Sequence, residues 1–297
     1  MSRADPPAPA GSPLLAATGG IALLCIMDAV MKQVVASTHP ITATWGRSVV
    51  SLLIAVPLWL AAGRPMLTRD VLVAHGVRGT VMTLSATSFF WALTVLPLAE
   101  AITLSFVAPL IIPFMAWALL RERPRLTSLT AGLVGFAGVL VTTQGAPPEA
   151  DTPQRTMGIL MMMLAAVAWA GSLVLLRGRA SRDGPAIVAL MGAAVPALLL
   201  MPVAAAIGEV PAPDALAWVA FAAALAVAGV WMMTHAYARA EAQVLAPLEF
   251  TALAWAALLG WAFFGEVPRL QIWVGAAIII AACLFAAWDE RRGRRPA

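Results

Sequence analysis

The stretch WALLRERPRL, residues 117–126, returns later in the chain as WAFFGEVPRL, residues 261–270. Six of the ten positions are identical: Trp, Ala, Glu, Pro, Arg and Leu. Other landmarks repeat at nearly the same spacing, namely Pro40 with Pro185, Pro57 with Pro202, Gly63 with Gly208, and Glu122 with Glu266. A repeat that spans almost half of the 297 residues predicts a chain made of two similar halves.

The composition indicates which solvent surrounds these halves. Hydrophobic residues make up 61% of the chain and charged residues only 11%, whereas soluble domains carry about 25% charged residues. Lipid is therefore the expected solvent, and about 20 apolar residues are needed for each crossing. Ten apolar runs meet this requirement: Leu14–Val35, Ile41–Ala61, Val71–Leu93, Leu98–Leu120, Leu126–Thr143, Met157–Leu176, Pro185–Ile207, Ala215–Ala236, Val244–Phe264 and Leu270–Trp288. The sequence predicts an all-α integral membrane protein with ten transmembrane helices.

The distribution of basic residues predicts the orientation of these helices. If the N-terminus is cytoplasmic, 14 of the 19 basic residues lie in cytoplasmic segments, and only Arg155 and Arg269 lie in outer loops. Both termini are then expected inside. Because each half has five crossings, the second half enters the membrane inverted. Arg121 and Arg123 of the first phrase are replaced by Gly265 and Val267 in the second, as expected for copies on opposite sides.

These features predict a simple domain organisation. Residues 1–13 form a flexible tail, 14–143 the first repeat, 144–156 an outer linker, 157–288 the second repeat and 289–297 a basic cytoplasmic tail. Cys25 and Cys283 lie inside apolar runs, which gives no sign of a disulfide or metal site. Neither a nucleotide-binding loop nor a zinc-protease motif is present, so no cofactor is expected. The clustered arginines do not indicate a nucleic-acid surface.

Ten spans in two units, each with a Glu at the end of its fourth helix, resemble the drug/metabolite transporter superfamily, EamA-type branch. The matching segments are WALLRERPRLTSLTAGLVGFAGVLV (117–141) and WAFFGEVPRLQIWVGAAIIIAACLF (261–285). The resemblance implies a central cavity lined by the first, third and fourth helices of each half. Carriers with this layout in the superfamily include exporters of aromatic and other amino acids and uptake carriers for S-adenosylmethionine, so the resemblance implies a function of this kind.

Inverted repeats are typical of alternating access, because two halves of opposite topology can exchange conformations. The sequence therefore predicts a secondary or facilitative carrier of small metabolites in the cytoplasmic membrane. Outward movement of aromatic or apolar amino acids is favoured, and a monomer suffices. Uptake of S-adenosylmethionine or a related cation is the alternative. An intramembrane enzyme is the rival of another class, and it would need a catalytic constellation that the sequence does not display.

Charged residues inside spans cost about 2.5–3.5 kcal/mol each and need a reason. Asp28 and Lys32 are spaced i, i+4, so they can pair on one helix face and recognise a zwitterion or form a gate. In the alternative interpretation, Lys32 reaches the headgroups and merely neutralises Asp28. Glu249, beside Pro247, is predicted to line the pathway as a proton-linked group or as a partner for a substrate ammonium.

The remaining charged groups are weaker candidates. Arg47, Arg78 and Glu100 lie near span ends, and we expect their side chains to reach water. His235 lies at the end of a span, where it can titrate or simply be hydrated.

Aromatic and hydroxyl residues complete the predicted site. Trp169 lies at mid-span among small residues, so its indole can stack on a ring or hold an ammonium, although it can equally face lipid. Ser172 follows it by three residues. Ser88 and Trp91 belong to the run TLSATSFFW, residues 83–91, whose hydroxyls can line the pathway or bond between helices.

Overall fold

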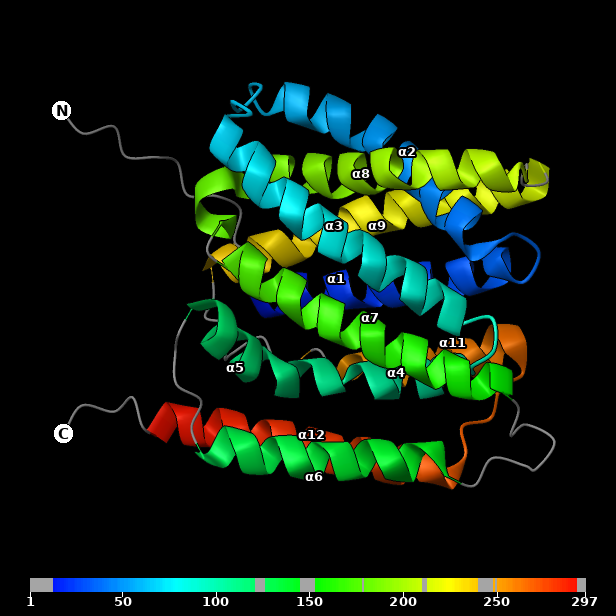
Figure 1. The fold of residues 1–297 in the computed structure, drawn as a ribbon, viewed down its shortest axis with the longest axis vertical. Coiled ribbons are helices and arrows are strands. Elements are labelled where there is room, and N and C mark those ends of the chain that lie inside the picture. The colour runs from blue at the N-terminus through cyan, green and yellow to red at the C-terminus, as the bar shows by residue number, and fades with distance from the viewer. Residues whose placement is uncertain are drawn as a thin grey trace.

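A computed structural model describes residues 13–120, 126–144, 153–177, 179–209, 213–239, 248 and 250–292, and every regular element in these ranges is a helix. The helices are α1 (Pro13–Val35), α2 (Pro40–Ala61), α3 (Arg69–Ala92), α4 (Leu98–Ser105), α5 (Val107–Leu120), α6 (Leu126–Thr143), α7 (Pro153–Arg177), α8 (Ala180–Ile207), α9 (Pro213–Arg239), α11 (Thr251–Phe264) and α12 (Leu270–Arg292). They run side by side in one bundle (Figure 1). The all-α class is confirmed.

The helices have the lengths and surfaces that lipid requires. Five of them in the described ranges are long and apolar enough to cross a membrane by length and composition: Leu15–Val35, Pro40–Ala61, Pro153–Leu176, Arg182–Ile207 and Ala215–Ala236. Large apolar side chains remain exposed, among them Leu133 (74%), Leu198 (67%) and Phe263 (71%). Water would penalise such a surface, whereas hydrocarbon does not.

The repeated landmarks occupy equivalent places in the two halves. Gly63 and Gly208 follow the ends of α2 and α8, and both adopt positive φ, 86° and 68°. Only glycine takes this left-handed conformation without steric cost, so it is favoured just past a helix end. Pro40 begins α2, and Pro185 follows the non-helical Gly184, where the main part of α8 begins.

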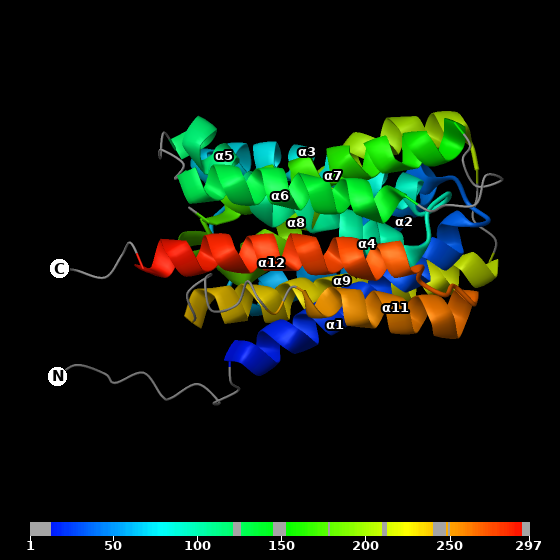
Figure 2. The same cartoon turned by 90° about the horizontal axis from the view of Figure 1, so that it is seen from below.

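Helix pairing follows the same equivalence. α1 packs on α9, and its counterpart α7 packs on α3, which is the counterpart of α9. α2 packs on α8 and α6 on α12, so each of these two pairs maps onto itself. Figures 1 and 2 show α6 and α12 side by side at one edge of the bundle, and Figure 1 shows α2 and α8 at the opposite edge. Inverted five-helix repeats explain this exchange of partners.

Both halves share one hydrophobic core. Met31 on α1, Leu104 on α4, Met162 on α7 and Ile279 on α12 are all buried in it with exposures of 1% or less. The two repeats therefore fold as one packed unit.

The fourth helix differs from its prediction. The run Leu98–Leu120 was expected to be one span, but the helix is interrupted at Phe106 between α4 and α5. The sequence explains the break, because a proline at position 109 has no N–H to bond the carbonyl of residue i−4, Ser105, where α4 ends. Predicted boundaries also shift elsewhere: α7 begins at Pro153, inside the segment expected to be a linker, and α12 continues to Arg292.

Candidate functional site

Two groups of charged residues join the halves, one at each end of the bundle. We call these the Glu100 end and the Arg179 end. The Glu100 end carries the α3–α4 and α11–α12 connections, and the Arg179 end carries the α2–α3 and α7–α8 connections.

At the Glu100 end, Lys32 and Glu266 bring α1 of the first half to the α11–α12 loop of the second. The Lys32 ammonium forms an ion pair with Glu266 Oε1 and also donates to the Leu96 carbonyl at 2.8 Å. Glu266 Oε2 accepts a hydrogen bond from the Leu98 N–H at 2.8 Å, at the start of α4. A helix N-terminus carries partial positive charge, so this carboxylate is stabilised from two sides.

Glu100 forms the second part of the same cluster. Its side chain is 1% exposed, and it is bound by Arg155 of α7 at 2.5 Å and by Arg269 of the α11–α12 loop at 2.9 Å. Arg269 also donates to the Gln144 carbonyl at 2.9 Å. We call Lys32, Glu100, Arg155, Glu266 and Arg269 the Glu100 cluster. Two arginines around one enclosed carboxylate hold both halves together at this end.

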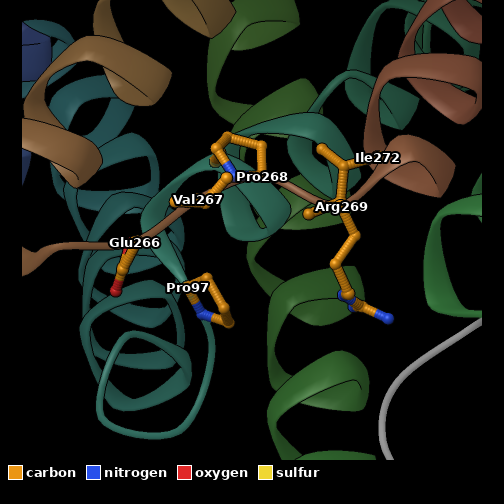
Figure 3. A pocket seen from close by; sticks show the side chains of 7 residues that line it. Pro97, Glu266, Val267, Pro268, Arg269 and Ile272 are labelled. Atoms are coloured by element: carbon orange, nitrogen blue, oxygen red, sulfur yellow. The ribbon is translucent and has the colours of Figure 1, made fainter.

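The loop between α11 and α12 positions two members of the cluster. A cleft of about 210 Å³ opens beside it, lined by Pro97, Ala99, Glu266, Val267, Pro268, Arg269 and Ile272. Figure 3 shows the Glu266 and Arg269 side chains well separated along the loop, with Val267 and Pro268 between them. Proline restricts the backbone, so one short segment can reach Lys32 with one side chain and Glu100 with the other.

The Arg179 end is joined by one exposed contact, between Arg179 and Asp70, and one buried contact, between His75 and Asp183. Arg179 donates two hydrogen bonds to Asp70 at 2.5 and 2.7 Å, and His75 Nε2 lies 2.9 Å from Asp183 Oδ2. The Asp70 side chain is 71% exposed. Hydrogen bonding to Arg179 lowers the pKa of Asp70 below its ordinary value. Exposed ion pairs stabilise little, so the Asp70–Arg179 pair contributes less to this end than its short distances suggest.

Asp28 and Lys32 do not form the predicted pair. Lys32 forms its ion pair with Glu266, which belongs to the α11–α12 loop of the other half. Asp28 interacts electrostatically with Arg47 of α2. The i, i+4 spacing permitted pairing but could not reveal a stronger partner distant in sequence.

The expectation that Glu100 and Arg78 reach water was wrong. Glu100 is buried because two arginines neutralise it. Arg78 is 7% exposed, and its Nε has no hydrogen-bond partner in the described ranges. Arg47 also has an enclosed Nε with no partner among the described residues, and its guanidinium lies 5.5 Å from the centre of the Phe90 ring.

The other predicted residues fall on two helix pairs. The α3–α7 pair carries Ser88, Trp91, Trp169 and Ser172, and Ser85 joins these helices by donating to the Ala165 carbonyl at 2.9 Å. Ser88 is 5% exposed, and Ser172 is fully buried with no partner for its hydroxyl in the described ranges. Trp169 is partly buried against the core.

His235 lies on α9, beside α1. Its Nδ1 is 3.0 Å from the Trp231 carbonyl and its ring is 5.6 Å from that of Trp231, so the histidine contacts its own helix. Glu249 lies outside the described residues.

Sequence reasoning missed the Glu100 cluster, although a signal was present. Arg155 and Arg269 were the two exceptions to the predicted cytoplasmic distribution of basic residues, and both bind Glu100. A basic residue on the disfavoured side of a membrane needs a local acidic partner, and Arg155 and Arg269 have the same one, Glu100.

Comparison with known proteins gives the family. The family model described as EamA-like transporter family matches residues 12–144 and again 156–288. A riboflavin transporter of Rhizobium johnstonii is 32% identical, with 78% of this chain and 72% of the relative covered. A riboflavin transporter of Brucella anthropi is 28% identical, with 82% and 86% covered. An S-adenosylmethionine uptake transporter of Rickettsia felis is 24% identical, with 89% and 88% covered.

One crystal structure of a protein matches with a TM-score of 0.61 and 22% sequence identity over 96% of this chain and 99% of the solved chain, which supports the fold alone. The family and these relatives confirm the resemblance drawn from the repeated phrase. They make the chain a multi-pass membrane transporter of small metabolites, not an enzyme. With one family match in each half, this chain belongs to the EamA-like transporter family.

Proposed function

We propose that this transporter carries riboflavin, or a metabolite with the same flat fused ring, across the cytoplasmic membrane by alternating access. The observation that carries the proposal is the match to riboflavin transporters over 78% and 82% of the chain. A third relative with that name, from Vibrio cholerae, is 28% identical over 74% of the chain.

The α3–α7 pair offers the chemistry that such a molecule needs. Riboflavin is uncharged, with an aromatic ring system and a chain of hydroxyl groups. Trp91 and Trp169 can contact the ring, while the buried hydroxyls of Ser88 and Ser172 can bond the chain. The buried Ser172 hydroxyl has no partner among the described residues, and a ligand could supply one, because buried polar groups are almost always hydrogen-bonded.

The orientation belongs to the same proposal. By the distribution of basic residues, the Glu100 end faces outward and both termini face the cytoplasm. The Glu100 cluster then closes the outer side of a single-chain carrier whose repeats span 14–143 and 157–288 and are joined by the linker 144–156. Opening that side requires the cluster to separate, while the contacts of the Arg179 end keep the inner side closed.

S-adenosylmethionine is the second candidate, because relatives with that substrate in their names cover 89–90% of this chain at 24% identity. Its ammonium and carboxylate would suit Asp28 and Arg47. Export of aromatic amino acids, the expectation from the sequence, would use the same two charges and remains the third.

Exchange assays in proteoliposomes separate these candidates. Vesicles preloaded with unlabelled compound are diluted into labelled riboflavin, S-adenosylmethionine or an aromatic amino acid, and saturable uptake without chemical change is measured. Riboflavin exchange is the expected result, and exchange of only one of the other two would overturn the proposal. Trp169→Ala should reduce exchange, whereas Trp218→Ala, at a 48% exposed residue of α9, should leave it unchanged.

A further inference from the structure

We propose that Asp28 and Arg47, with Phe90 beside them, read the imide edge of the substrate ring. This assignment rests on the proposed function and specifies which part of the molecule is recognised. The three residues come from α1, α2 and α3, so three helices of the first half converge on one charged, aromatic position inside the bundle.

The two charges interact without satisfying each other. Asp28 and Arg47 interact electrostatically, yet no hydrogen bond or ion pair joins Asp28 to any residue in the described ranges. Arg47 Nε is likewise enclosed and unpartnered among these residues. A partly buried acid and a partly buried base on neighbouring helices, with no hydrogen bond between them, retain hydrogen-bonding capacity that a third molecule can use.

The described polar groups one turn away on α1 do not supply that third partner. The Lys32 ammonium, one turn along α1, is bound by Glu266 and the Leu96 carbonyl. The Cys25 thiol, one turn in the other direction, donates to the Ala252 carbonyl at 3.8 Å. Charged residues within membrane spans usually mark a substrate path, and here the described surroundings leave Asp28 and Arg47 for the substrate.

Phe90 limits what the substrate can be. Its ring is 2% exposed and lies beneath the Arg47 guanidinium, which fixes that group by cation–π attraction. A guanidinium is planar, so its N–H donors lie in one plane. The matching ligand is a flat ring whose edge carries carbonyl acceptors for Arg47 next to an N–H donor for Asp28.

Riboflavin has this edge. Its pyrimidine ring presents a carbonyl, an N–H and a second carbonyl in sequence, all in the plane of the fused rings. Arg47 would donate to a carbonyl, and Asp28 would accept from the N–H. Methylation of that nitrogen removes the donor and adds bulk while leaving the ring and the hydroxyl chain intact, so 3-methylriboflavin isolates this contact.

The test compares riboflavin with 3-methylriboflavin in exchange assays on wild type and on the Asp28→Ala, Arg47→Gln and Phe90→Leu variants. Wild type should prefer riboflavin by about 10- to 100-fold, because a hydrogen bond to a charged group is lost. Asp28→Ala should weaken riboflavin to the level of the methylated compound and leave the latter nearly unchanged. Arg47→Gln should weaken both, and Arg64→Gln, at an exposed residue beyond α2, should weaken neither.

The outcomes keep the two proposals apart. Riboflavin exchange with no preference over 3-methylriboflavin in wild type would overturn the imide assignment and leave the transport proposal standing. An equal loss of both compounds in Asp28→Ala would make Asp28 structural and also overturn the assignment. If wild type exchanges no riboflavin, the proposed function fails and the imide assignment fails with it. The wild-type comparison decides even if a variant does not fold.

Discussion

Lys32 and Glu266 are 234 positions apart in the chain and form an ion pair that joins the first helix of one repeat to the last connection of the other. If this pair closes one side of the carrier, it must separate in every transport cycle. A short covalent link in its place should therefore stop transport. The prediction uses Lys32→Cys with Glu266→Cys, in a chain whose Cys25 and Cys283 are replaced by alanine.

Treatment of that double-cysteine chain with a short bifunctional thiol reagent should abolish exchange, and a reductant should restore it. Each single-cysteine chain serves as the control and should keep its activity after the same treatment. Continued transport by a chain that mass spectrometry shows to be fully linked would mean that this end does not open.

Glu100 is expected to contribute strongly to stability. Removing the acid from a buried ion pair leaves charge uncompensated and costs about 3–5 kcal/mol. Glu100→Gln would leave Arg155 and Arg269 without their shared carboxylate, so thermal unfolding in detergent should begin at a clearly lower temperature. Arg64→Gln, which removes a charge at an exposed residue, is the control. Equal melting temperatures for the two variants would contradict a structural role for the Glu100 cluster.

Gly79 marks a close approach between the halves. A Cβ added there would lie 2.5 Å from the Val195 Cβ on α8, so Gly79→Ala should destabilise the protein by about 1–3 kcal/mol through overpacking. Gly76→Ala, one turn earlier on the same helix, meets nothing within 4 Å and should be neutral or slightly stabilising. Adding Val195→Gly should restore part of the loss in Gly79→Ala, as measured by thermal unfolding. Equal effects of the two alanines would contradict this packing.

The contact between Asp70 and Arg179 should be insensitive to pH in the physiological range. Because Arg179 lowers the pKa of Asp70 below 3.8, the carboxylate stays charged above that value, and the stability it contributes is lost only as pH falls through the lowered pKa. The difference in melting temperature between wild type and Asp70→Asn should be constant from about pH 8 to 5 and shrink below about pH 4. A change in that difference near neutral pH would contradict the assignment.

Much of the helix architecture could be predicted because hydropathy and the repeated phrase both act locally. The expected run Leu126–Thr143 matches α6, and Ile41–Ala61 differs from α2 by one residue. The break at Phe106 was missed because a run of apolar residues keeps its hydropathy whether or not a proline interrupts its hydrogen bonds.

The charged contacts were harder to predict. Spacing along one helix suggested Asp28 with Lys32, but Lys32 pairs with Glu266 from another element, and no local pattern encodes that choice. The predicted residues Trp169, Ser172, Ser88 and Trp91 share the α3–α7 pair, a juxtaposition that required the helix pairing to be known. Their role in binding stays a prediction.

The exchange of helix partners has a consequence for how such a protein can arise and be assembled. α1 packs on α9 and α3 packs on α7, so the helices of each half pack more extensively on the other half than on one another. Chains severed between the repeats should accordingly be active only when both fragments are synthesised in the same cell. Two copies of a five-helix ancestor, inserted in opposite orientations, would form the same contacts as a dimer. Gene duplication followed by fusion could then produce this chain without a change of packing.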